Sequence, residues 1–398
     1  MPAVHLLSSA TQVSRSRSPW ILRSQIERTR GDSSCGATAV IYDHRRELVG
    51  VGLYDPGDDI AVRVLHWGGP LNVDEELVRM RLDAALRRRE PLVERGDTTG
   101  YRMVFGESDA LPGLVLDRYG QTVVVKLYTA VWFRFLPTLL EWLRGWDERV
   151  CVVLRLSRLV KEAAGASGNL KDGAVLVGAL PASGRVGFVE YGVSFECDPV
   201  AGQKTGFFLD QRENRVLVGR KSAGATVLNL FSYSGGFSVH AAVGGATEVT
   251  SVDIAPAAMR DCDRHMRLNA GLIARCRHHG VVADVFEYLE SQRDRRWDVV
   301  VVDPPSFAHG AGQKERALVS YRNLAQMSAR VVSDGGLLVL ASCSRPIRRP
   351  EFMQACDEGL ERSRRRLDLE ELRGHALDHP ADFAPLEYLK CAYYRARA

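Results

Sequence analysis

The fold of this chain is decided by residues 225–237, Ala-Thr-Val-Leu-Asn-Leu-Phe-Ser-Tyr-Ser-Gly-Gly-Phe. The apolar run at the start of this stretch predicts a buried strand, and two glycines follow it closely. Two later apolar runs end similarly, one at Asp253 and one at Asp303-Pro304-Pro305. In open α/β sheets, ligands bind at the carboxyl ends of the strands. The sequence therefore predicts an α/β enzyme with its site at that edge.

The alternation of strands and helices changes along the chain and predicts three domains. From 199 to 398, strands alternate with helices as in a doubly wound sheet, and we expect strands at 225–231, 248–253, 279–283, 298–303 and 336–342. Residues 1–72 are β-rich, with strands expected at 37–43, 48–54 and 60–65, which predicts a small barrel or sheet. Residues 73–198 mix both types and predict an α+β domain, in which 157–177 is expected to be a loop or an insertion.

The composition is that of an ordinary globular protein, with 45% hydrophobic and 26% charged residues. The length of 398 residues suits two or three domains. No apolar run approaches the roughly 20 residues of a membrane helix, and the basic N-terminus lacks the apolar core of a signal peptide. We therefore expect a cytoplasmic protein without a membrane partner.

The net charge and the spacing of the cysteines exclude few classes of function. A formal net charge of +4 and several arginine clusters give RNA binding modest support. The 8 cysteines form no Cys-x-x-Cys pair, which argues against a disulfide framework or zinc ribbon. A group of cysteines and histidines lies close in sequence, but its spacing fits no standard zinc finger: Cys262, His265, Cys276, His278 and His279. No metal site is expected.

The first two strand ends carry groups suited to a nucleoside. Gly235 lets the backbone approach a ligand closely, because it has no Cβ. Asp253 lies about where a carboxylate can accept both hydroxyls of a ribose. Asp284 follows the next strand; it could accept from an adenine amino group or, equally well, cap the helix that begins at Val285.

The stretch Asp303-Pro304-Pro305-Ser306-Phe307 is the sharpest motif. Two prolines stiffen the loop and have no N–H, so the loop offers hydrogen-bond acceptors. A flipped nucleobase needs acceptors for its amino group and an aromatic ring to stack on, and Phe307 supplies the ring. We therefore expect Asp303, Pro304, Pro305 and Phe307 to bind a base.

Cys343 ends the strand predicted at 336–342, at the same edge of the sheet as Asp303. A cysteine thiolate can act as a covalent nucleophile, so Cys343 is a candidate catalytic residue. Free cysteine is also often a small buried hydrophobic residue, and position alone leaves that alternative open.

Residues 229–241, Asn-Leu-Phe-Ser-Tyr-Ser-Gly-Gly-Phe-Ser-Val-His-Ala, resemble the S-adenosylmethionine motif of class I RNA methyltransferases. The preceding stretch 202–212, Gly-Gln-Lys-Thr-Gly-Phe-Phe-Leu-Asp-Gln-Arg, resembles the entry motif of one branch, the large-subunit rRNA cytosine-C5 methyltransferases with an N-terminal PUA domain. Further matches lie at 106–109, 111–113, 117–120 and 387–391. The resemblance spans nearly the whole chain and is weakest over 1–35.

This resemblance implies a PUA-like barrel, a central α+β domain and a Rossmann-like methyltransferase domain. It implies S-adenosylmethionine as cofactor, with Asp253 at its ribose, Asp284 near its adenine and the turn 231–235 at its methionine moiety. The cofactor-binding residues implied or expected from the motifs are Phe208, Asp210, Arg212, Phe231, Tyr233, Gly235, Asp253, Asp284 and Asp303. It also makes Cys343 the catalytic nucleophile, with Asp303 holding the base edge.

The expected reaction is formation of 5-methylcytosine in 23S rRNA through a covalent adduct between Cys343 and C6. A guanine-N7 rRNA methyltransferase shares several of these motifs and needs no cysteine, because the ring nitrogen attacks the methyl group directly. A non-catalytic RNA-binding or ribosome-assembly factor on this scaffold is the third alternative. The expected partner is 23S rRNA, and the sequence leaves a homodimer open as the assembly.

Overall fold

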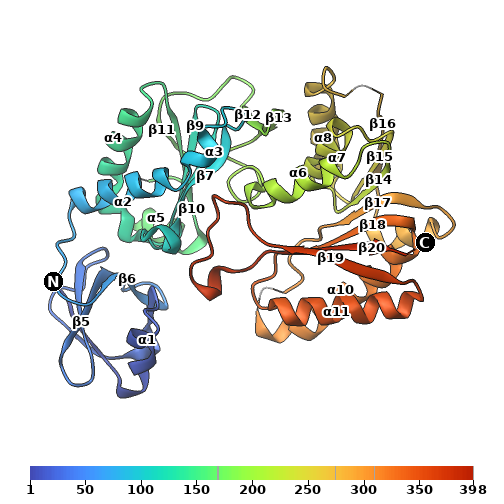
Figure 1. Ribbon diagram of the computed structural model, residues 1–398. Helices are drawn as coiled ribbons and strands as arrows, with labels where there is room; N and C mark the ends of the chain where they lie inside the picture. The colour runs from blue at the N-terminus through green and yellow to red at the C-terminus, as the bar shows by residue number, and fades with distance from the viewer. Residues whose placement is uncertain (168–169, 274, 309, 398) are drawn as a thin grey trace. The chain divides into compact units, whose positions relative to one another are not determined.

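The computed structural model describes residues 1–167, 170–273, 275–308 and 310–397 (Figure 1). The chain folds into two compact units. Unit 1 comprises Met1–Val189, Glu196–Leu209 and Leu377–Phe383, and unit 2 comprises Glu190–Phe195, Asp210–Ala376 and Ala384–Ala398. The domain boundaries placed after residues 72 and 198 stay a prediction.

The first sheet of unit 1 has six strands in the order β2-β6-β5-β4-β1-β3. Its strands are β1 Ala3–Leu6, β2 Trp20–Leu22, β3 Ile26–Arg30, β4 Thr38–Tyr42, β5 Leu48–Tyr54 and β6 Ile60–Trp67, with the short helix α1 Thr11–Arg15 between β1 and β2. Alternate side chains of β4 are buried, so one face of this strand packs on a core. The β-rich N-terminal part is confirmed, and β1, β2 and β3 are additions that the sequence did not predict.

The second sheet of unit 1 has the order β11-β10-β9-β8-β7. Its strands are β7 Gly100–Phe105, β8 Leu114–Tyr119, β9 Thr122–Leu127, β10 Cys151–Leu156 and β11 Val175–Val177, and the helices around it are α2 Glu75–Arg87, α3 Glu90–Val93, α4 Leu136–Trp146 and α5 Arg158–Ser167. The side chain of Asp74 begins α2 by accepting from the N–H of Leu77 at 2.9 Å. This mixture confirms the α+β expectation.

One expectation for this part is wrong. The stretch 157–177 was expected to be a loop or an insertion, and the loop alternative is wrong because the stretch contains α5 and β11; residues 168 and 169 lie outside the described part of the chain. Val160 and Ala164 stand four residues apart and are both buried, which gives α5 its packed face. Glycine and serine in this stretch obscured that helical spacing.

A short segment from near the C-terminus, Leu377–Phe383, belongs to unit 1. The backbone carbonyl of Asp378 accepts from the fully buried guanidinium of Arg89 at 2.9 Å. The Asp378 carboxylate accepts from the backbone N–H of Arg102 at 2.7 Å. The Arg89 guanidinium also forms a buried ion pair with Asp109 at 2.7 Å. The segment therefore supplies acceptors that buried donors of unit 1 require.

Unit 2 is built on a seven-stranded sheet in the order β16-β15-β14-β17-β18-β20-β19. The strands are β14 Thr226–Leu230, β15 Glu248–Asp253, β16 Arg277–Val282, β17 Trp297–Val302, β18 Val332–Ser342, β19 Leu367–Arg373 and β20 Lys390–Ala396. The first five are parallel, and β20 runs antiparallel to both β18 and β19. The five predicted strands are confirmed, whereas β19 and β20 were not predicted.

Helices cover both faces of this sheet (Figure 1). The helices α6 Arg212–Arg220, α7 Gly236–Val243 and α8 Pro256–Leu268 lie together on one side, and α9 Val285–Ser291, α10 Lys314–Arg330 and α11 Arg349–Ser363 lie on the other. The hairpin strands β12 Val186–Glu190 and β13 Val193–Cys197 form a separate two-stranded sheet. Among the described residues, no helix has both the length and the apolar character that crossing a bilayer requires.

Candidate active site

The turn after β14 has an unusual backbone. Phe231 and Tyr233 adopt positive φ angles of 56° and 47°, and Gly235 has a φ of 80°. Large side chains rarely adopt this conformation, and such residues concentrate at ligand sites where the surrounding structure enforces it. The backbone N–H of Ser232 donates to the carbonyl of Val252 at 2.9 Å, which ties the turn to the neighbouring strand.

Asp253 stabilises the same turn from the end of β15. Its Oδ2 accepts from the backbone N–H of Tyr233 at 2.8 Å, and its Oδ1 accepts from that of Ala255 at 2.9 Å. Each carboxylate oxygen can accept a second hydrogen bond, and the side chain is partly exposed. Asp253 can therefore organise the turn and still accept two hydroxyl groups of a ligand.

Gly235 is required by both conformation and space. A Cβ added to it would lie 2.2 Å from Sγ of Cys262 and 3.0 Å from its Cβ. Its carbonyl accepts from the N–H of Val239 at 2.9 Å and so starts α7. The absent Cβ thus lets the first turn of α7 lie directly on α8, with its N-terminal end at the carboxyl edge of the sheet.

We expect Gly235→Ala to lower the free energy of unfolding by about 3 kcal/mol, because it adds an overlap of the kind that costs about 1 to 3 kcal/mol to a left-handed strain of about 1 to 2 kcal/mol. Gly224→Ala is the matched control, since Gly224 has a φ of 74° with no atom within 4 Å of the added Cβ. Urea denaturation of both variants measures the difference. Equal losses would show that the contact with Cys262 contributes nothing.

Asp284 caps α9. Its Oδ1 accepts from the backbone N–H groups of Phe286 and Glu287 at 2.8 and 3.2 Å. The capping interpretation from the sequence is confirmed. A hydrogen bond from the adenine amino group would therefore have to be accepted by the second oxygen, Oδ2. This adenine contact stays a prediction.

The loop after β17 lies beside the turn after β14. The backbone N–H of Asp303 is 3.5 Å from the carbonyl of Leu230. Pro304 is buried and Pro305 is exposed. The ring of Phe307 stands edge-on to Phe231, with centroids 6.4 Å apart, and tilts against Tyr321 at 5.2 Å. Phe307 is therefore held between two aromatic rings of this edge, where one part-exposed face can meet a base.

Cys343 follows β18 and is partly exposed, whereas Ser342 and Ser344 on either side are fully buried. The hydroxyl of Ser342 donates to Tyr321 Oη at 2.9 Å, and Tyr321 Oη lies 3.2 Å from the hydroxyl of Ser344. Burial raises the pKa of Tyr321 to about 12, so its hydroxyl keeps its proton at neutral pH. Tyr321 thereby fixes both neighbours of the cysteine from α10.

Ser306 extends this hydroxyl network into the Pro-Pro loop. Its hydroxyl hydrogen bonds to that of Ser344 at 2.9 Å and reaches the carbonyl of Ala308 at 2.8 Å. The loop that carries Asp303 and the turn that carries Cys343 are therefore joined by hydrogen bonds. The sequence analysis included Ser306 in its motif without giving it a role, and it missed Tyr321, because a helical tyrosine gives no motif of its own.

The entry motif of the sequence divides between the units. Asp210 and Arg212 lie in unit 2, where Tyr388 Oη donates to Asp210 Oδ2 at 2.6 Å. The fully buried Arg212 forms an ion pair with Glu213 at 2.9 Å. Phe208 lies in unit 1, with Nζ of Lys204 4.3 Å from its ring centroid. Tyr388, 178 residues from Asp210, was identified in the sequence only as part of a matching motif.

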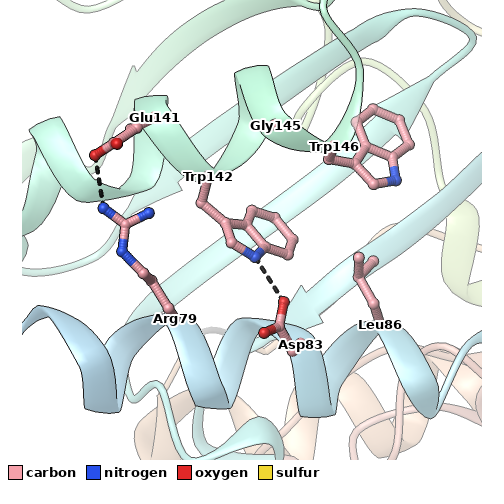
Figure 2. A pocket seen from close by; sticks show the side chains of 7 residues that line it. All are labelled: Arg79, Asp83, Leu86, Glu141, Trp142, Gly145 and Trp146. Carbon is pink, nitrogen blue, oxygen red and sulfur yellow. Dashed lines mark hydrogen bonds and ion pairs between the residues drawn. The ribbon is translucent and has the colours of Figure 1, made fainter.

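A separate pocket opens in unit 1 between α2 and α4 (Figure 2). Its side chains come from Arg79, Asp83 and Leu86 of α2 and from Glu141, Trp142 and Trp146 of α4. Trp142 Nε1 donates to Asp83, and Arg79 pairs with Glu141, so both carboxylates already have partners. None of the residues predicted for catalysis or cofactor binding lines this pocket.

No cluster of metal ligands occurs among the residues that the structure describes. Cys262 Sγ lies 3.6 Å from Nε2 of His278, and burial raises the pKa of this thiol to about 12. The thiol is therefore protonated at neutral pH and packs beneath Gly235 as a structural group.

Comparison with known proteins identifies two regions of the chain. Residues 181–389 match the family described as S-adenosylmethionine-dependent methyltransferase, and residues 4–67 match the PUA-like domain. The chain is 45% identical over 381 residues to a ribosomal RNA large subunit methyltransferase of Deinococcus radiodurans, covering 94% of this chain and 92% of the relative. It is 32% identical to ribosomal RNA large subunit methyltransferase I of Photobacterium profundum, covering 98% of both chains.

Solved structures agree in fold. A SAM-dependent methyltransferase from Streptococcus mutans superposes with a TM-score of 0.82 at 22% identity, over 99% of this chain and 100% of the other. A second methyltransferase structure, that of SMU.776 complexed with SAH, reaches a TM-score of 0.84 with the same identity and coverage. The chain therefore belongs to the S-adenosylmethionine-dependent methyltransferases with an N-terminal PUA-like domain, and S-adenosylmethionine is its cofactor.

Proposed function

We propose that this protein methylates C5 of a cytosine in 23S rRNA through a covalent adduct with Cys343. The observation that carries the proposal is the placement of Cys343, which is partly exposed at the same sheet edge as Asp303 and linked to its loop through Ser344 and Ser306. The names of the relatives, ribosomal RNA large subunit methyltransferases, support the choice of RNA.

The residues at the ends of β14 and β15 fit S-adenosylmethionine. A Cβ at Gly235 would collide with Cys262, so the glycine keeps the turn close to the helix and leaves its backbone open to a ligand. Asp253 would accept the ribose hydroxyls with the lone pairs that Tyr233 and Ala255 leave unused. Phe231, Tyr233 and Gly235 would border the methionine moiety. When bound, S-adenosylmethionine supplies an electrophilic methyl group.

The other predicted cofactor-binding residues would each contact one part of the cofactor or border its site. Asp284 would reach the adenine with Oδ2, because Oδ1 caps α9. Asp210 and Arg212 would complete the cofactor site within unit 2, and an anionic ligand would share the Arg212 guanidinium with Glu213. Phe208, in unit 1, stays a sequence prediction for the same site.

The chain's own residues would act on the cytosine as follows. The Cys343 thiolate adds to C6, which places electron density at C5 and allows it to take a methyl group. Asp303 holds the amino edge and N3 of the base, Pro304 and Pro305 keep the loop rigid, and Phe307 stacks on the ring. Loss of the C5 proton and breakage of the S–C6 bond then release methylated RNA and free thiolate.

Unit 1 would supply much of the RNA affinity. Arg30 of β3 and the turn residues Arg45 and Arg46 are exposed, and exposed arginines suit phosphate contacts. The PUA-like match over 4–67 includes all three.

We expect mass mapping of 23S rRNA to reveal one methylated cytosine that is present only when the protein is expressed. Cells lacking the protein and cells expressing it are compared, and the Asp253→Ala variant serves as a control in which cofactor binding is expected to be weakened. A methyl group on guanine instead would support the N7 alternative. The absence of any difference in methylation would support the non-catalytic alternative and overturn the proposal.

A further inference from the structure

Lys390, the first residue of β20, contacts the turn 343–347 that follows β18, which we call the Cys343 turn. It pairs with Ser342 in the antiparallel ladder between β18 and β20, and it is 1% exposed. Its Nζ donates to the backbone carbonyl of Ser344 at 2.8 Å and to that of Ile347 at 2.8 Å. The ammonium therefore holds the loop that begins at Cys343 by two of its backbone carbonyl groups.

The buried position of the Lys390 ammonium is unfavourable for the stability of the fold. Both of its acceptors are carbonyl oxygens, and no carboxylate in the described part of the chain forms an ion pair with it. An ammonium buried without an opposite charge destabilises a protein by several kcal/mol. Burial lowers the pKa of Lys390 to about 8, and the charge of Cys343 is the largest of the influences that oppose this shift.

We propose that Lys390 is a positioning residue that fixes the Cys343 turn and favours the thiolate form of Cys343 by its positive charge. The positive charge of Lys390 would stabilise that thiolate. This role rests on the proposed function, in which the Cys343 thiolate is the nucleophile. It also accounts for the buried ammonium, because the thiolate supplies the negative charge that the two carbonyl groups lack.

The charge of Cys343 influences both Lys390 of β20 and Tyr321 of α10. Lys390 would favour the thiolate, and Asp303 after β17, whose charge also acts on Tyr321, would oppose it. Tyr321 of α10 is neutral at physiological pH, because its pKa is raised to about 12. Glu387, Glu351 and Arg349 influence Lys390 itself. The ammonium loses its proton as the pH rises through about 8, so its effect on the thiol is complete below that pH and disappears above it.

The test measures the alkylation rate of Cys343 by iodoacetamide in the full-length folded protein, at pH values from 5 to 10, by peptide mass mapping. We expect Lys390→Gln to raise the pH midpoint of Cys343 alkylation by about one unit, since a nearby opposite charge shifts a pKa by about 1 to 3 units. Lys126→Gln is the matched control, because Lys126 also donates to a backbone carbonyl, that of Leu156, and burial lowers its pKa to about 8 as well.

An unchanged midpoint in a folded Lys390→Gln protein would overturn the proposal. A second measurement does not need that variant to fold: the midpoint of Cys343 in the wild-type protein should lie below that of Cys343 in the urea-unfolded chain, and a higher value would also overturn it. Neither measurement uses RNA or cofactor. Failure of the C5 reaction is detected separately, by methylation that persists in Cys343→Ala.

Discussion

Replacement of Cys343 by alanine is expected to lower methyl transfer to 23S rRNA by more than about 1,000-fold, the scale observed when a covalent nucleophile is removed. Without the thiolate, C5 of cytosine is too weak a nucleophile to take the methyl group. Binding of S-adenosylmethionine, measured by calorimetry, should be unchanged, because Asp253 and Gly235 lie at other strand ends. The rate is measured with a radiolabelled cofactor and rRNA from cells that lack the protein.

Cys276→Ala provides the matched control, since Cys276 is also partly exposed and lies in unit 2. It should retain wild-type activity. Full activity of Cys343→Ala would exclude the covalent route and favour attack by guanine N7, which requires no thiol.

Replacement of Asp253 by alanine is expected to weaken S-adenosylmethionine binding by at least about 100-fold. Two hydrogen bonds to a carboxylate contribute about 1.5 to 3 kcal/mol each, and each 1.4 kcal/mol corresponds to a factor of about ten in affinity. The substitution also removes the acceptor for the backbone N–H of Tyr233, so the strained turn should become less ordered. Calorimetric titration of the variant with S-adenosylmethionine measures the loss.

Asp298→Ala controls for the general loss of a carboxylate from this sheet. Asp298 accepts from the backbone N–H of Thr226 at 2.8 Å, at the amino end of the strands and away from the proposed site. Its replacement should reduce stability without a large change in cofactor affinity. If Asp253→Ala kept wild-type affinity, the ribose would have to be held elsewhere.

The parallel part of the unit 2 sheet could be predicted because each strand is a short apolar run that ends in a polar signal. The runs before Asp253 and Asp303 have this form, and β15 and β17 match them within one residue at each end. The antiparallel strands gave no such signal. In β19, charged residues fill most positions of Leu367–Arg373, and only pairing with β20 makes this stretch a strand.

The motif residues could be predicted, but the groups that hold them could not. Cys343 and Asp303 stand at strand ends that the hydrophobic pattern locates. A lysine in a sequence is normally predicted to be exposed, because lysine side chains are almost never fully buried. Lys390, however, is almost fully buried. Its burial depends on two carbonyl acceptors more than forty residues away, and no local pattern encodes such a partnership.

The segment Leu377–Phe383 has a consequence for the order of events during synthesis. Unit 1 contains Met1–Val189, yet the acceptor that Asp378 gives to the Arg89 guanidinium lies 289 residues after Arg89 and is made much later. At about 5 to 20 residues per second, the ribosome needs roughly 10 to 40 seconds to pass from residue 189 to residue 383. During that interval the Arg89 N–H that Asp378 accepts must remain hydrated or use a temporary partner, although the ion pair with Asp109 can already form. Complete folding of the first unit therefore waits until the segment Leu377–Phe383 has been translated.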